Sequence, residues 1–217
     1  MKPTRSILLA MILGAAVAGC ANEGELVVVA GGAGVTAVRT ACPAVGVPHY
    51  TGDVTTFRTP GATTADQIDV AATITKLRST CNENGAQVYS EASFEVRARR
   101  SDTRGARTVQ LPYFSTVLQG GSAVQAKRIG SVSVTFADGQ ERAVATGRAG
   151  AFVNRDAATL PAEIRERITR RRKPGDPDAA LDPLADPQVR AAVNRATFEL
   201  LVGFQLTQDQ LAYNATR

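Results

Sequence analysis

A long stretch of alternating side chains, from about residue 68 to residue 153, constrains the fold of this chain more than any other feature. After the turn sequence at residues 82–85, apolar or small side chains occupy every second position, and Tyr, Glu and Arg fill most positions between them. The alternating apolar or small positions are Val88, Ser90, Ala92, Phe94, Val96 and Ala98. A period of two is that of a β-strand with one buried face. The pattern therefore predicts a hairpin that buries one face in a core.

Alternation of the same kind recurs on both sides of this hairpin. Residues 68–81, 109–117, 132–136 and 143–153 also place apolar side chains at alternate positions. The turn-forming pairs Gly-Gly and Asp-Gly separate the later segments. Five or six antiparallel strands at this spacing predict a mainly β fold, either a sandwich of the immunoglobulin or fibronectin type or a small barrel.

The last third of the chain changes to a helical period. Leu160, Ile164 and Ile168 recur every four residues, which predicts a helix with the basic residues 170–173 at its C-terminal end. The pair Asp186-Pro187 is typical of the start of a second, short helix.

Strand periodicity then returns near the C-terminus. Residues 198–206 alternate strictly, and Thr207 with Gln210 forms a capping-box pattern for a terminal helical turn. We therefore expect a single β-rich domain over residues 42–217, with a helical insertion around residues 158–196.

The first 19 residues have the features of an export signal. Lys2 and Arg5 precede a largely apolar run of eleven residues that ends at Val17. A helix needs roughly 20 apolar residues to span a bilayer, so this run predicts a cleavable signal peptide. Two alternatives stay open. One is a soluble secreted protein cut after an Ala-x-Ala-like site, and the other is an N-terminal core helix.

The sequence Val17-Ala18-Gly19-Cys20 at the end of this run resembles the lipobox of bacterial lipoproteins. The resemblance implies that residues 1–19 are removed and that Cys20 becomes an acylated N-terminus carrying fatty-acyl chains such as palmitate. Two acyl chains hold a protein on a membrane stably, whereas one does so only marginally. Ala21 in place of Asp implies transfer to the outer membrane, facing the periplasm. Residues 20–41 would then form a lipidated, Gly- and Ala-rich tether.

A second resemblance concerns the segment from Val202 to Asn214, which reads VGFQLTQDQLAYN. This segment, the pair Cys42-Pro43 and the Arg-Ser-Thr-Cys sequence that ends at Cys81 together resemble a family of alphaproteobacterial lipoproteins with no assigned activity. The resemblance supports lipidation and supplies no catalytic residue.

Cleavage before Cys20 would leave Cys42 and Cys81 as the other cysteines of an exported chain. The periplasm is kept oxidising, and the pair lacks Cys-x-x-Cys spacing, so we expect a structural disulfide. Two buried thiols packed as small hydrophobes are the alternative. Removal of the first 19 of the 217 residues also lowers the formal net charge from +5 to +3, so global charge says little about partners.

The sequence offers little catalytic or metal-binding chemistry. His49 is the only histidine, which leaves no Ser-His-Asp triad, Cys-His pair or multi-histidine metal site. The aspartates from Asp176 onward do not fit an EF-hand, because Leu181 stands in place of its glycine and Pro187 in place of its glutamate. We therefore expect no metal, no cofactor and no enzymatic activity.

Two arginine clusters are candidate contacts for an anionic partner. Their members are Arg97, Arg99, Arg100, Arg104 and Arg107 near a predicted turn, and Arg170, Arg171 and Arg172 after the predicted helix. Phosphorylated lipid headgroups and acidic proteins are available in the envelope, and we expect no nucleic-acid partner there. The alternative is a solvated surface whose charge is offset by neighbouring Asp and Glu residues.

Three functions fit these observations. The first is a periplasmic lipoprotein anchored to the outer membrane, acting as a non-catalytic structural or interaction module that contacts an envelope protein or an anionic headgroup. The second is a carrier for a lipid or another apolar small molecule, which requires a deep apolar cavity. The third is an envelope hydrolase, for which the sequence has no recognisable motif.

Overall fold

The computed structural model describes residues 40–170, 172–173, 175–178 and 180–216. Residues 40–169 and 182–216 belong to one compact unit, and the described residues from 170 to 181 belong to another, so the two are treated separately. The predicted signal peptide, most of the predicted tether, Cys20 and Arg171 lie outside the described residues.

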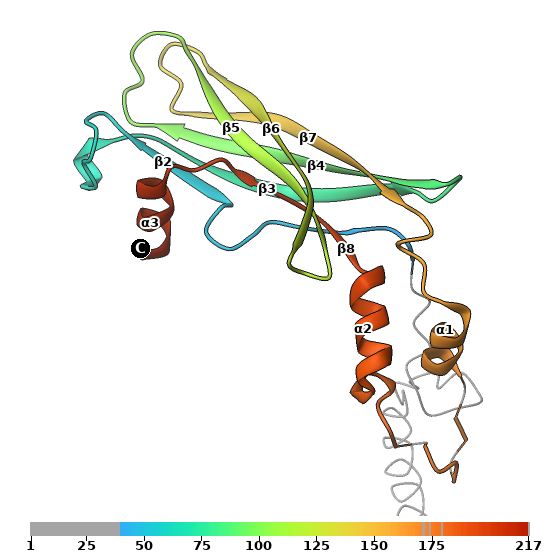
Figure 1. Ribbon diagram of the computed structural model, residues 1–217. Helices are drawn as coiled ribbons and strands as arrows, with labels where there is room; N and C mark the ends of the chain where they lie inside the picture. Colours follow the sequence, from blue (N-terminus) through green and yellow to red (C-terminus); the bar gives the residue numbers. More distant parts are fainter. Residues whose placement is uncertain (1–39, 171, 174, 179, 217) are drawn as a thin grey trace, which may run out of the picture. The chain divides into compact units, whose positions relative to one another are not determined.

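The main unit is built from two four-stranded sheets, which confirms the prediction of a mainly β fold (Figure 1). One sheet has the order β1 (Ala44–Gly46), β8 (Phe198–Phe204), β5 (Arg107–Gln119) and β6 (Ala123–Phe136). The other has the order β2 (Asp53–Phe57), β3 (Ile68–Asn82), β4 (Gln87–Arg100) and β7 (Arg142–Asn154). Neighbouring strands are antiparallel, apart from the short edge strand β1, which pairs with β8 in parallel.

The hydrophobic core draws on the inner faces of both sheets. Val96 of β4, Val134 of β6 and Val202 of β8 are completely buried within it. Apolar burial of this kind is the main favourable term in folding. The alternating side chains of β4 therefore face this core on one side of the strand and solvent on the other.

Aromatic rings on the core side of the strands lie over glycines of neighbouring strands. A Cβ atom at Gly147 would lie 2.3 Å from the ring of Phe94, and one at Gly130 would lie 2.6 Å from the ring of Tyr113. The two rings meet edge to face, with 5.2 Å between their centroids. The glycines are thus required because the aromatic rings occupy the space that their side chains would fill.

Two helices form a second, smaller core after β7. Ile164 of α1 (Ala162–Thr169) packs in one cluster with Val189 and Val193 of α2 (Pro187–Ala196). The carboxylate of Asp186 accepts a hydrogen bond from the N–H of Gln188, so Asp186 is the N-cap of α2, as the Asp-Pro pair predicts. A 3₁₀ turn, η2 (Pro183–Ala185), precedes α2.

Helix α1 ends at Thr169, and the prediction that residues 170–173 form its C-terminal end is therefore wrong. In their own unit, Arg170 and Arg172 both pair with the carboxylate of Asp178, and Asp176 accepts a hydrogen bond from the backbone N–H of Lys173. These aspartates therefore pair with the cations and with a backbone N–H of their own segment, which does not continue helix α1.

The C-terminal helix α3 (Gln208–Thr216) lies beside β2 (Figure 1). Its first turn is fixed by the predicted capping box, in which the Gln210 N–H donates to the Thr207 hydroxyl and the Thr207 N–H donates to the Gln210 side-chain oxygen. Its last turn is fixed by Asn214, whose buried amide donates to the carbonyls of Tyr50 and Asp53, each at 2.8 Å.

Cys42 and Cys81 form a disulfide, as the cysteine count predicts. Cys42 lies just before β1, the edge strand of one sheet, and Cys81 lies near the end of β3 in the other sheet, so the bond links the two sheets. The two Cα atoms are 6.1 Å apart.

Candidate functional site

His49 lies in an exposed turn between β1 and β2, beside Tyr50. Among the residues that the structure describes, no hydrogen bond links its imidazole to a hydroxyl, a thiol or a carboxylate. A general base has to lie within hydrogen-bond reach of the group that it activates. The geometry therefore offers no pairing that would activate a nucleophile through this side chain.

The residues of the first arginine cluster lie in three different environments, and the third, that of Arg100, is buried. Arg97 and Arg99 project from the outer face of β4 and remain exposed. Arg104 and Arg107 form ion pairs with Asp102 and Asp69 near the β4–β5 turn.

Arg100 does not fit the prediction that it contacts an anionic partner, because its side chain is buried, with 1% of its surface exposed. Its guanidinium donates to the backbone carbonyls of Thr103, Gly105, Ala137 and Gln140 at 2.7–2.8 Å. These carbonyls belong to the β4–β5 and β6–β7 turns. Arg100 is therefore a structural residue that holds two turns together. Its position could have been found from the sequence, since it continues the inward alternation of Val96 and Ala98.

The paired arginines of this cluster perturb their carboxylate partners. Nη1 and Nη2 of Arg107 each lie 2.7 Å from an oxygen of Asp69 and hold the pKa of that carboxyl below its ordinary value. The Arg104 side chain and its backbone N–H likewise hold the pKa of Asp102 below its usual range. Both arginines are thus engaged by carboxylates of the chain itself.

A further arginine, which no sequence motif singles out, lies beside Arg99. Arg142 of β7 is the direct register partner of Arg99, and Arg97 lies on the same face two residues earlier. The three guanidinium-bearing side chains line a shallow depression of about 350 Å³ with Ala71 and Thr73 of β3. We call this surface the arginine face. Arg99 and Arg142 lie side by side because of the register between β4 and β7, although they are about forty residues apart in sequence. No local sequence pattern reveals such a pairing.

Carboxylates surround the arginine face without lining the depression. Glu141 accepts a hydrogen bond from Arg99 at 2.5 Å, and Glu95 lies 3.3 Å from Arg97. Arg142 has no ion-pair partner among the described residues. On the arginine face, the guanidinium group of Arg142 therefore lies next to that of Arg99 without a carboxylate of its own, within the described part of the chain, to balance its charge.

A pair of aromatic side chains lies on the same outer surface, at the other end of β4 and β7. Tyr89 and Phe152 are register partners whose ring centroids are 4.8 Å apart, and 65% of the Phe152 surface is exposed. The Tyr89 hydroxyl donates to Glu91, which raises the pKa of that phenol. Arginine and aromatic residues are enriched where proteins contact their partners.

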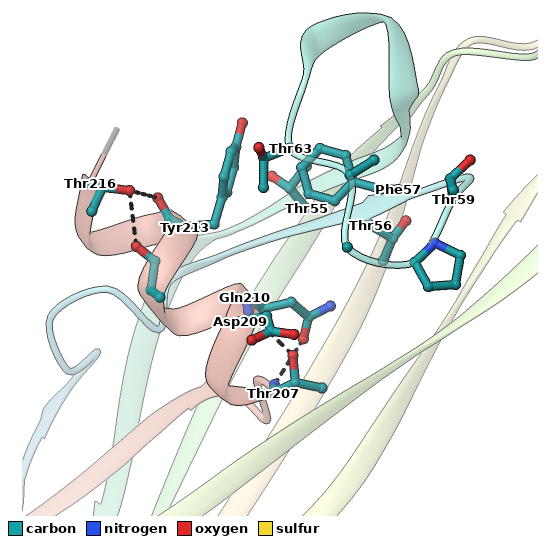
Figure 2. Close-up of a pocket in the computed structure, with 14 residues that line it drawn as sticks. Thr55, Thr56, Phe57, Thr59, Thr63, Thr207, Asp209, Gln210, Tyr213 and Thr216 are labelled. Carbon is teal, nitrogen blue, oxygen red and sulfur yellow. Dashed lines mark hydrogen bonds between the residues drawn. The ribbon is translucent and has the colours of Figure 1, made fainter.

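The second candidate site is a groove of about 920 Å³ that α3 forms with β2 and the loop at residues 59–63 (Figure 2). We call it the threonine groove. Six threonines line it, namely Thr55, Thr56, Thr59, Thr63, Thr207 and Thr216. Phe57 and Tyr213 contribute two aromatic rings, and Asp209 the one carboxylate among its lining residues. Its walls are about 150 residues apart in sequence, which is why sequence reasoning missed it.

Comparisons with protein-family models, with curated proteins and with solved structures find no match to this chain. Among the described residues, no helix has both the length and the apolar character needed to cross a membrane. Function must therefore be argued from the two sites themselves.

Proposed function

We propose that this chain is a lipid-anchored protein of the cell envelope, held on the periplasmic face of the outer membrane, whose β-rich domain is a non-catalytic module for contact with an anionic partner. The anchor is inferred from the lipobox-like sequence that ends at Cys20. The contact function rests on one observation, the direct pairing of Arg99 with Arg142 across β4 and β7.

Like charges placed directly opposite each other on neighbouring strands destabilise a sheet. Arg99 has a carboxylate partner in Glu141, but two facing guanidinium groups with Arg97 beside them still leave excess positive charge over a floor of small side chains. An anion placed between the arginines would remove this repulsion. The arrangement is therefore better suited to a complex with an anion than to the free protein.

The partner that this geometry favours carries phosphate groups. Guanidinium groups bind phosphate oxygens in a planar, two-pronged geometry that an ammonium group cannot reproduce. Phosphorylated lipid headgroups would be the nearest phosphates to a protein that is itself anchored in a membrane. The exposed ring of Phe152 on the same outer surface would add apolar contact area.

Acyl labelling in growing cells tests the anchor. Cells fed a fatty acid with a chemical handle should label the wild-type chain and leave a Cys20→Ala variant unlabelled. The wild-type protein should also fractionate with outer membranes. Label that persists in Cys20→Ala would overturn the anchor, and the contact function is tested separately on the arginine face.

A further inference from the structure

We propose that the threonine groove binds a neutral oligosaccharide chain. This groove shares no lining residue with the arginine face and would bind a ligand of different chemistry. Its volume of about 920 Å³ falls within the range of about 300–1,000 Å³ that is usual for ligand-binding clefts.

The charge of the lining argues against an anionic ligand. Among the described residues that line the groove, Asp209 is the one carboxylate, and Lys, Arg and His are absent. Binding an anion here would therefore bring it near a carboxylate with no cation in the lining to compensate. A single exposed carboxylate also does not require a cationic ligand, because it can accept hydrogen bonds from neutral O–H groups.

Three of the six threonine hydroxyls in the groove are already used as donors. The Thr56 hydroxyl donates to the Val70 carbonyl, that of Thr59 to the side-chain oxygen of Gln67, and that of Thr216 to carbonyls within α3. A hydroxyl has one proton and two acceptor positions, so these threonines can still accept hydrogen bonds. With Asp209, they give the lining several hydrogen-bond acceptors, which suits an uncharged ligand with many O–H donors.

The aromatic pair adds the second feature of a saccharide site. The rings of Phe57 and Tyr213 meet at 86°, with 5.2 Å between their centroids, and Figure 2 shows them above the groove opposite Asp209 and Gln210. A ring face is the negative pole of the aromatic quadrupole and attracts the weakly positive C–H groups of a sugar ring. The lining thus combines ring surface with polar atoms.

The groove is held in place before any ligand binds. Asn214 joins α3 to the chain around Tyr50 and Asp53, and the capping box of Thr207 and Gln210 fixes the start of the same helix. A preformed site loses less conformational entropy on binding than one that has to be ordered.

Titration calorimetry on the full processed protein, in a detergent without a sugar headgroup, tests the proposal. The probes are maltotetraose and the tetramer of N-acetylglucosamine, with a neutral tetrapeptide for comparison. We expect saturable binding of at least one saccharide, and at least about tenfold weaker binding in Asp209→Asn and Tyr213→Ala. Asp209 is exposed and its substitution conserves shape, so this variant remains informative even if Tyr213→Ala disturbs α3.

The matched control is Phe152→Ala, which removes an exposed aromatic ring outside the groove and should leave saccharide affinity unchanged. The proposal is overturned if neither saccharide binds at about 5 mM, if both groove variants bind as the wild type does, or if the tetrapeptide binds more tightly than either saccharide.

Discussion

The guanidinium of Arg100 lies over the ring of Phe136, with 5.2 Å between Arg100 Cζ and the ring centroid. Both side chains are buried where the β4–β5 and β6–β7 turns meet. The buried cation is satisfied by backbone carbonyls and by the aromatic face, and no carboxylate among the described residues pairs with it. These contacts account for a charged side chain in the buried row of β4.

Replacing Arg100 should therefore destabilise the fold far more than replacing an exposed neighbour. Arg100→Leu leaves buried carbonyls without donors, and we expect a loss of about 3 kcal/mol in the free energy of unfolding. Arg99→Leu is the matched control and should change stability by less than about 0.5 kcal/mol. Urea unfolding measures both, and equal losses would contradict the structural role assigned to Arg100.

The disulfide should contribute strongly to stability. Its 39-residue separation corresponds to about 4 kcal/mol in the chain-entropy model, so the double variant Cys42→Ser/Cys81→Ser should unfold at a much lower urea concentration. Cys20→Ser, which leaves the pair intact, should unfold as the wild type does. Coincident unfolding curves for all three proteins would contradict this account of the bond.

The aromatic rings over glycines make a further prediction about packing. Gly147→Ala would place a methyl group within 2.3 Å of the Phe94 ring, and we expect a loss of about 1–3 kcal/mol from overpacking. Gly46→Ala is the control, because a Cβ there would meet Leu201 at an ordinary contact distance of 3.4 Å. Thermal or urea unfolding compares them, and a Gly147→Ala variant as stable as Gly46→Ala would be inconsistent with the packing described.

The ion pair of Asp69 with Arg107 predicts a pH dependence. Because Arg107 holds the pKa of Asp69 below its ordinary value, the pair stabilises the fold above the unfolded-state pKa of about 3.9, and this contribution is lost as pH falls through the lower folded pKa. The pair is partly exposed, so we expect Asp69→Asn to cost no more than about 1 kcal/mol at pH 7.

Unfolding free energies measured from pH 7 down to pH 2 test this dependence. The difference between wild type and Asp69→Asn should shrink as the solution becomes acidic. Asp209→Asn, which removes an exposed carboxylate without an ion pair among the described residues, should run parallel to the wild type. A constant offset for Asp69→Asn across the whole range would show that its carboxylate charge is not the cause.

Features that produce a local pattern in the sequence, such as alternation or a capping motif, could be predicted. The two faces of β4, the capping box at Thr207 and the helix start at Asp186 are all as the sequence suggests. The length of strand β6 is greater than the sequence predicts, because the strand begins at Ala123 and the alternating pattern only at Val132. Its first residues are exposed on both faces, so they show no alternation of apolar and polar side chains.

Features that depend on distant pairing could not be predicted. The arginine face exists because Arg142 falls opposite Arg99, and a shift of one residue in the β4–β7 register would move Arg142 to a different neighbour. The threonine groove depends on Asn214 bringing α3 to β2. Both candidate sites thus arise from tertiary contacts and not from a motif.

Flotation with phospholipid vesicles tests the central claim most directly. The protein should be the processed chain carrying Cys20→Ser, so that no acyl anchor contributes. We expect it to float with phosphatidylglycerol vesicles, to stay behind with phosphatidylcholine vesicles, and to detach as salt screens the contact. Arg99→Gln/Arg142→Gln should lower the bound fraction at least about fivefold, whereas the charge-matched pair Arg190→Gln/Arg195→Gln, exposed on α2, should change it less than about twofold. Equal losses in the two double variants, or no binding of the wild type to anionic vesicles, would contradict the account.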